Sequence, residues 1–177
     1  TVNVAALLAE LGKMVVVVDM DPQGNATSGL GVSRANLEHG IYEALARQRQ
    51  VSDIVFDTSH EGLRIAPATQ NLAGASVELV SVDNREFQLR ELLSEIRHGY
   101  DYIFIDCPPS LGLLTINSLV AADQLLIPVQ AEYYALEGLG QLLETVKWVQ
   151  THIHPDLQVL GAVLTMFDKR TKLSGEV

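Results

Sequence analysis

The chain alternates between short apolar runs and longer stretches whose apolar residues recur at helical spacing. The clearest run covers residues 14–18, where Met14 is followed by four valines. A continuous β-branched run of this length is typical of a strand that is buried on both faces of a parallel sheet. Similar runs predict further strands over residues 63–66, 100–106, 124–129 and 159–166.

The stretches between these strands carry the helical pattern. Helices are predicted over residues 1–11, 36–47, 71–80, 85–98, 111–122 and 136–151. Strands that alternate with helices of this length predict an α/β fold, with a doubly wound, mostly parallel sheet and helices on both faces. The 177 residues, 47% hydrophobic and 19% charged, suit one soluble domain over residues 1–177.

Acidic residues stand where the first strand ends. Asp19 and Asp21 lie two positions apart, so an extended backbone projects both carboxylates to the same side. Pro22 and Gly24 then prevent further sheet pairing and predict a polar loop over residues 23–29. Ligands bind at the carboxyl ends of strands in such sheets, but a lone Asp-x-Asp is equally well explained as a solvated loop.

A second strand ends in the same way. The run over residues 100–106 closes on Asp106 and is followed by Cys107, Pro108, Pro109 and Ser110, which cannot continue a strand. Two buried strands that end in acids bring hard oxygen ligands to one crevice, as Mg²⁺ bound to nucleotide phosphates requires. The pair of strand ends therefore favours a nucleotide site over a solvated loop.

Three sequence blocks resemble, in matching order, the ParA/Soj partitioning ATPases of the deviant Walker A (ParA/MinD) superfamily: VVVVDMDPQGNATSGLG, YIFIDCPPSLG and PVQAEYYALEGL. The resemblance covers essentially the whole chain and implies a P-loop NTPase-like fold. In that family a strand and a KGGVGKTT-type phosphate loop precede the first helix. We therefore expect the chain to be truncated at both ends, without the N-terminal strand, the phosphate loop and the C-terminal part.

The resemblance also implies a role for each residue of the site. Asp21 is expected to be the catalytic switch acid that orients the attacking water, and Asp106 the Walker B acid that holds Mg²⁺. The implied cofactors are ATP and Mg²⁺. The residues expected to support the nucleotide are Asp19, Gln23, Gly24, Asn25 and Pro108.

The partners implied by the resemblance are a second copy of the chain in the presence of ATP, non-specific DNA and a ParB-type protein that stimulates hydrolysis. Bulk charge does not suggest DNA binding, because 12 basic and 22 acidic residues leave a formal net charge of −10. The dense basic cluster of Lys169, Arg170 and Lys172 is a candidate phosphate contact, and the main DNA surface is expected beyond Val177.

Several features predict a cytoplasmic protein without stable membrane insertion, and the resemblance implies that it associates with the nucleoid. No apolar run approaches the roughly 18 residues of a membrane span, and the first residues lack the pattern of a signal peptide. The single cysteine, Cys107, cannot form an intramolecular disulfide, in agreement with a reducing compartment.

Two other functions remain open from the sequence. A MinD-like membrane-surface ATPase would share the fold and both acid-terminated strands. A non-catalytic scaffold domain could use Asp19, Asp21 and Asp106 as an acidic pocket.

Overall fold

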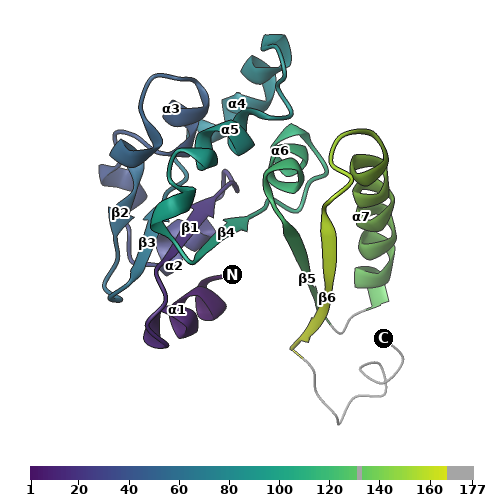
Figure 1. Ribbon diagram of the computed structural model, residues 1–177, viewed down its shortest axis with the longest axis horizontal. Helices are drawn as coiled ribbons and strands as arrows, with labels where there is room; N and C mark the ends of the chain where they lie inside the picture. The colour runs from purple at the N-terminus through teal and green to yellow at the C-terminus, as the bar shows by residue number, and fades with distance from the viewer. Residues whose placement is uncertain (131–132, 167–177) are drawn as a thin grey trace. The chain divides into compact units, whose positions relative to one another are not determined.

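The computed structural model describes residues 1–130 and 133–166. The chain divides into two compact units, Thr1–Ala121 and Ala122–Val177, and each is described by itself (Figure 1). The organisation of residues 1–177 as one domain stays a prediction.

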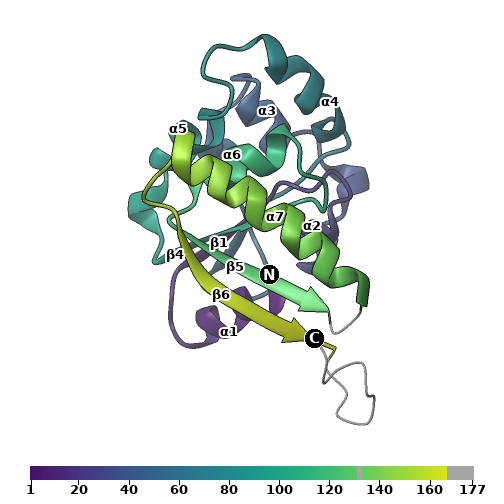
Figure 2. The same ribbon diagram turned by 90° about the vertical axis from the view of Figure 1, so that its right-hand side faces the viewer.

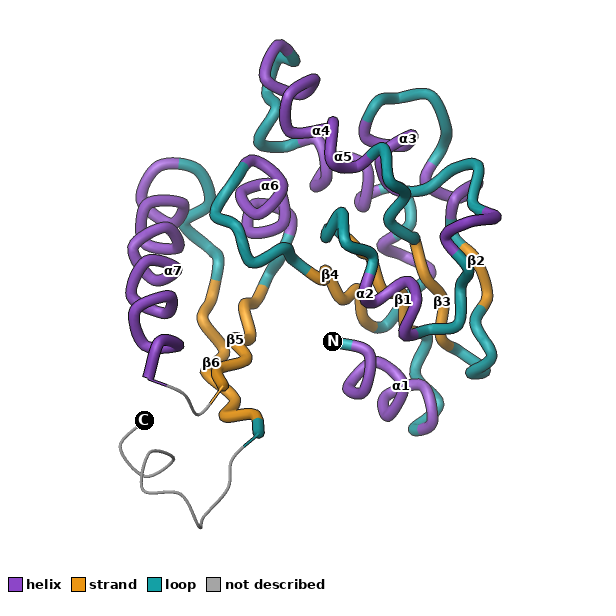
Figure 3. The backbone as a smooth tube through the Cα atoms, turned by 180° about the vertical axis from the view of Figure 1, so that it is seen from behind, coloured by secondary structure: helices purple, strands orange, loops and turns teal. Residues whose placement is uncertain are grey.

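Four strands form the sheet of the first unit. They are β1 (Val15–Asp19), β2 (Phe56–Asp57), β3 (Leu63–Ala66) and β4 (Tyr102–Asp106), and Figure 3 shows them side by side in the order β2-β3-β1-β4. β1 is parallel to both β3 and β4, whereas the short edge strand β2 is antiparallel to β3. The predicted, mostly parallel sheet is thus confirmed.

The central strand β1 supplies apolar side chains to two cores because successive residues of a strand point to opposite faces. Val15 and Val17 belong to a cluster with residues of α1 (Val2–Glu10) and α2 (Asn25–Gly29). Val18 belongs to a second cluster with residues of α3 (Ile41–Leu45), α4 (Leu72–Glu78), α5 (Gln88–Ser94) and α6 (Leu113–Ala121). The predicted helices on both faces are confirmed, and Figure 1 shows α1 and α3 on opposite sides of the sheet.

The second unit contains β5 (Gln124–Gln130), α7 (Tyr133–His152) and β6 (Gln158–Thr165). β5 and β6 are parallel, so the chain must cross over between them, and α7 makes that connection. Figure 2 shows α7 lying alongside the two strands. Among the described helices, none combines the length and the apolar character needed to cross a bilayer.

The sequence overestimated some helices and missed other elements. The helix predicted over residues 36–47 is limited to Ile41–Leu45, because the extended Gly40 precedes it and Arg47 ends it with a positive φ of 59°. α2 lies inside the stretch that was predicted to be a loop, and β2 was not predicted. Four short 3₁₀ helices complete the first unit: η1 (Arg34–Asn36), η2 (Val51–Ile54), η3 (Leu79–Ser81) and η4 (Arg97–Gly99).

Candidate active site

The two acid-terminated strands are neighbours in the sheet. β1 and β4 pair in parallel along five positions, and the pairing ends with Asp19 directly opposite Asp106. Neighbouring strands lie about 4.8 Å apart, so the two carboxylates lie together at the carboxyl ends of these strands. The predicted juxtaposition of these two acids is confirmed.

Asp19 is fully buried, and its carboxylate is surrounded by donors. Oδ2 accepts hydrogen bonds from the Thr27 backbone N–H (2.8 Å) and the Thr27 hydroxyl (2.6 Å), and Oδ1 accepts one from the Asp21 N–H (3.1 Å). Burial raises the pKa of Asp19; the donors of Thr27 and Asp21 oppose this rise, and nearby Asp106 adds to it. Asp19 therefore organises the loop that follows β1, rather than offering free lone pairs to a reactant.

Asp21 stands at the start of a tight turn in that loop. Its Oδ1 accepts a hydrogen bond from the Gln23 N–H (2.9 Å), while its backbone carbonyl accepts one from the Gly24 N–H (2.8 Å). Gly24 is buried and takes a left-handed conformation with φ 66°, which glycine adopts without steric cost. Gln23 and Asn25, on either side of it, are exposed.

Asp106 lies beside the N-terminus of α1. It is half-buried, and its Oδ1 accepts a hydrogen bond from the hydroxyl of Thr1, the N-cap residue of that helix. Pro108, also half-buried, lies two positions further along, in the loop after β4. The N-terminus of a helix attracts anions because its backbone N–H groups are unpaired.

This arrangement fits a magnesium–phosphate group. Carboxylate and hydroxyl oxygens are hard metal ligands. In nucleotide sites Mg²⁺ takes one or two ligands from the protein and the rest from phosphates and water. Within residues 1–130 and 133–166, no group of three or more His, Cys, Asp and Glu residues is arranged to hold a metal ion. A magnesium site shared between the protein and the phosphates agrees with the residues present.

Sequence reasoning missed two side chains that shape this site. Thr27 connects Asp19 to the backbone N–H of Ala68, which lies just after β3. Arg34 contacts backbone carbonyls of the loop that carries Asp21. Neither has a pattern in the sequence that could have marked it, because their partners are distant residues or backbone atoms.

Comparison with known proteins identifies the family. The AAA domain family model matches residues 1–159. The sporulation initiation inhibitor protein Soj of Bacillus subtilis is 54% identical over 177 residues, which are all of this chain and 70% of that protein. The chain belongs to the Soj/ParA family of partitioning ATPases.

Further members and relatives agree with this assignment. The chromosome partitioning protein ParA of Myxococcus xanthus is 52% identical over 99% of this chain and 62% of its own length. A crystal structure described as cobyrinic acid a,c-diamide synthase from Mycobacterium smegmatis, with a bound ATP analogue and magnesium, superimposes with a TM-score of 0.93. The two chains are 40% identical, and the match covers 98% of this chain and 70% of the synthase chain. The higher identity to Soj and ParA assigns the chain to the partitioning proteins, and the superposition confirms the predicted P-loop NTPase-like fold.

Proposed function

We propose that the complete protein hydrolyses ATP with Mg²⁺ at the carboxyl ends of β1 and β4, and that Asp21 is the catalytic acid. The observation that carries this proposal is the register in which Asp19 and Asp106 end neighbouring parallel strands. The Soj/ParA relationship supplies the reaction, and the ATP analogue and magnesium in a solved relative agree with the two cofactors.

Each residue of the site has a separate task in this proposal. Asp106 holds Mg²⁺, while Asp19 fixes the loop so that the Asp21 carboxylate orients and polarises water. The residues that line the nucleotide at these strand ends are Gln23, Gly24, Asn25 and Pro108. When bound, Mg²⁺ supplies positive charge that offsets the negative charge of the phosphates, so the protein contributes mainly position and electrostatics.

The proposed biological role is chromosome or plasmid partitioning by a cytoplasmic, nucleoid-associated protein. The names of the Soj and ParA relatives support it. In this role an ATP-bound dimer binds DNA without sequence preference, and a ParB-type protein stimulates hydrolysis. The basic cluster of Lys169, Arg170 and Lys172 lies outside the described residues, so the relationship to the Soj and ParA proteins is the support for the DNA contact.

Two substitutions in the full-length protein test the assignment of the acids. Asp21→Ala should lower kcat by about 10²-fold or more with little change in ATP affinity, because it removes the group that orients water. Asp106→Ala should weaken Mg²⁺-dependent ATP binding, because it removes the metal's carboxylate. Turnover and calorimetric binding, with and without Mg²⁺, separate the two effects.

Asp53→Ala, at an exposed carboxylate on η2, is the matched control and should leave both measurements unchanged. If Asp21→Ala hydrolyses ATP at the wild-type rate while ATP binding is intact, Asp21 is not the catalytic acid. Unchanged Mg²⁺ dependence in Asp106→Ala would remove Asp106 from the metal site.

A further inference from the structure

We propose that Arg34 is a positioning residue for hydrolysis: it holds the loop that carries Asp21 against the segment after β3. The proposal rests on the function assigned above to Asp21, and it goes beyond it by naming what sets the position of the loop. Arg34 begins η1, 13 positions beyond Asp21 in the sequence, and belongs to neither strand of the site.

Three donors of the Arg34 guanidinium reach three backbone carbonyls. Nη1 donates to the Gln23 carbonyl, Nη2 to the Pro22 carbonyl (2.7 Å) and Nε to the Ala68 carbonyl (3.3 Å). Two of these carbonyls belong to the residues that directly follow Asp21, whereas the third lies 34 positions from Arg34. One side chain therefore joins the catalytic loop to the chain that leaves β3.

Gly24 leaves the space that this contact needs. A Cβ atom added at Gly24 would lie 2.5 Å from Nε and 2.7 Å from Cζ of Arg34. The guanidinium thus lies directly against the backbone of Gly24. A side chain at position 24 would therefore be unfavourable for two reasons, the left-handed backbone conformation and the close approach of Arg34.

A second connection fixes the same loop from its other end. Thr27 Oγ1 donates to Asp19 Oδ2 and accepts a hydrogen bond from the Ala68 N–H (3.0 Å). Ala68 is fully buried, and its backbone is the shared partner of both connections. Arg34 contacts its carbonyl and Thr27 its N–H, and residues 21–27 are held between them.

Arginine suits this task because its planar group presents several donors in a fixed fork, whereas lysine presents one flexible ammonium. Small displacements of a catalytic group have large effects on rate, since a shift of about 1 Å can cost 10²-fold. Loss of Arg34 should therefore reduce the rate of the chemical step more than the affinity for ATP.

The first measurement is steady-state ATP hydrolysis by the full-length protein, together with binding of a non-hydrolysable ATP analogue. We expect Arg34→Ala to lower kcat roughly ten- to hundred-fold, while the Kd of the analogue changes less than about threefold. Arg34→Lys should recover part of kcat because an ammonium can still donate to these carbonyls one or two at a time. The control is Arg64→Ala, which removes an exposed arginine that pairs with Asp57.

The second measurement is hydrogen exchange of the backbone amides of Gln23, Gly24 and Thr27, which reports the loop whether or not ATP is turned over. These amides should exchange faster in Arg34→Ala and remain as in wild type in Arg64→Ala. Gly24→Asn tests the same contact from the other side, because asparagine tolerates the left-handed conformation but its Cβ displaces the guanidinium. It should reproduce the faster exchange of Arg34→Ala.

Wild-type kcat in Arg34→Ala, or a lower kcat with unchanged amide exchange, would overturn the proposal. A parallel loss of ATP affinity and kcat would also overturn it, because it would show a general structural role. Failure of the wild-type protein to hydrolyse ATP would instead overturn the function proposed for Asp21.

Discussion

At the scale of single residues, the proposed site contains a buried acid whose oxygens accept hydrogen bonds from the loop after β1. Asp19 is fully buried, and its donors come from residues 21 and 27. A buried carboxylate without partners is strongly destabilising, so these donors both permit Asp19 to be present and determine where the loop runs. The arrangement makes Thr27 the residue whose removal is most informative.

The first prediction concerns Thr27→Val, which keeps the shape of the side chain and removes its hydroxyl. Asp19 then loses one donor and the Ala68 N–H loses its acceptor. We expect the free energy of unfolding at pH 7 to fall by about 1–3 kcal/mol. Thr27→Ser, which keeps the hydroxyl, should lose much less. Chemical denaturation of the full-length variants provides the comparison.

The effect should depend on pH in a defined direction. Because the folded pKa of Asp19 lies above its ordinary value of 3.8, protonated Asp19 contributes stability that is complete below that value and is lost as the pH rises through the folded pKa. Thr27→Val removes a hydrogen bond that lowers this pKa, so the folded pKa rises further. The loss of unfolding free energy caused by Thr27→Val should therefore become smaller as the pH falls through the folded pKa of Asp19. A deficit independent of pH would show that the hydroxyl does not act through Asp19.

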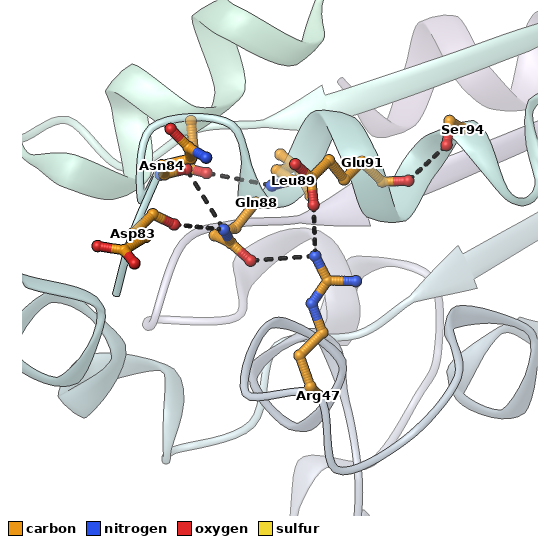
Figure 4. Close-up of polar contacts among 8 residues, drawn as sticks. Arg47, Asp83, Asn84, Gln88, Leu89, Glu91 and Ser94 are labelled. Atoms are coloured by element: carbon orange, nitrogen blue, oxygen red, sulfur yellow. Dashed lines mark hydrogen bonds and ion pairs between the residues drawn. The ribbon is translucent and has the colours of Figure 1, made fainter. Parts of the chain in front are cut away.

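At the scale of elements, a polar network joins the ends of several helices on one face of the sheet. Arg47, at the end of α3, donates to Gln88 Oε1 (3.1 Å) and to Glu91 Oε2 (2.7 Å) on α5 (Figure 4). Gln88 Nε2 in turn donates to the carbonyls of Asp83 (3.1 Å) and Asn84 (3.3 Å). The network fixes the start of α5 relative to α3.

Asn117 makes the corresponding connection from α6. It is fully buried; its Oδ1 accepts a hydrogen bond from the Leu89 N–H (3.1 Å), and its Nδ2 donates to the carbonyls of Arg85 (2.8 Å) and Leu113 (3.0 Å). The Leu89 N–H belongs to the first turn of α5 and has no partner within that helix. A side chain of one helix therefore satisfies the beginning of another.

The second prediction compares these two connections. Asn117→Ala should lower the free energy of unfolding by about 2–3 kcal/mol, because it leaves a buried N–H without an acceptor. Glu91→Ala breaks an ion pair whose two side chains are 51% and 53% exposed, and it should cost less than about 1 kcal/mol. Urea unfolding of both variants measures the difference. Equal losses would contradict the view that burial decides which connection stabilises the fold.

At the scale of the whole molecule, the formal net charge of −10 opposes contact with DNA. A partitioning ATPase of this composition must concentrate its positive charge locally or double it by dimerisation. Two copies that each present the same weak DNA-binding surface bind DNA with an avidity that neither copy reaches alone. Nucleotide-dependent dimerisation would then act as a switch for DNA affinity.

The third prediction follows from that argument. Binding of unrelated DNA duplexes by the full-length protein should require ATP and weaken steeply between low and physiological salt, because it depends on counterion release. Fluorescence titrations with and without ATP across a salt series test this, and vesicles of anionic lipid serve as the control ligand. Equal DNA affinity in both nucleotide states, or ATP-dependent binding to vesicles in place of DNA, would favour a MinD-like membrane-surface ATPase.

Much of this molecule could be inferred from local patterns. The order of the strands and helices other than α2 and β2, the two strands that end at Asp19 and Asp106, and the turn at Gly24 all follow from patterns among neighbouring residues. Periodicity, β-branching and turn residues act over a few positions, so a single sequence is enough to recognise them. The resemblance to the Soj/ParA family depended on the same local blocks.

Tertiary structure alone decided how these parts meet. The register of Asp19 with Asp106 joins positions 87 apart, and the contact of Arg34 with Ala68 spans 34 positions. The helix α2 forms in a stretch predicted to be a loop, where the Asp19 carboxylate accepts the Thr27 N–H. Such bonds leave no period in the sequence, because they join a side chain to backbone groups that every residue possesses. The sequence by itself therefore determined which acids end the two strands, because that pattern is local, and the fold determined how those acids meet and which residues contact them.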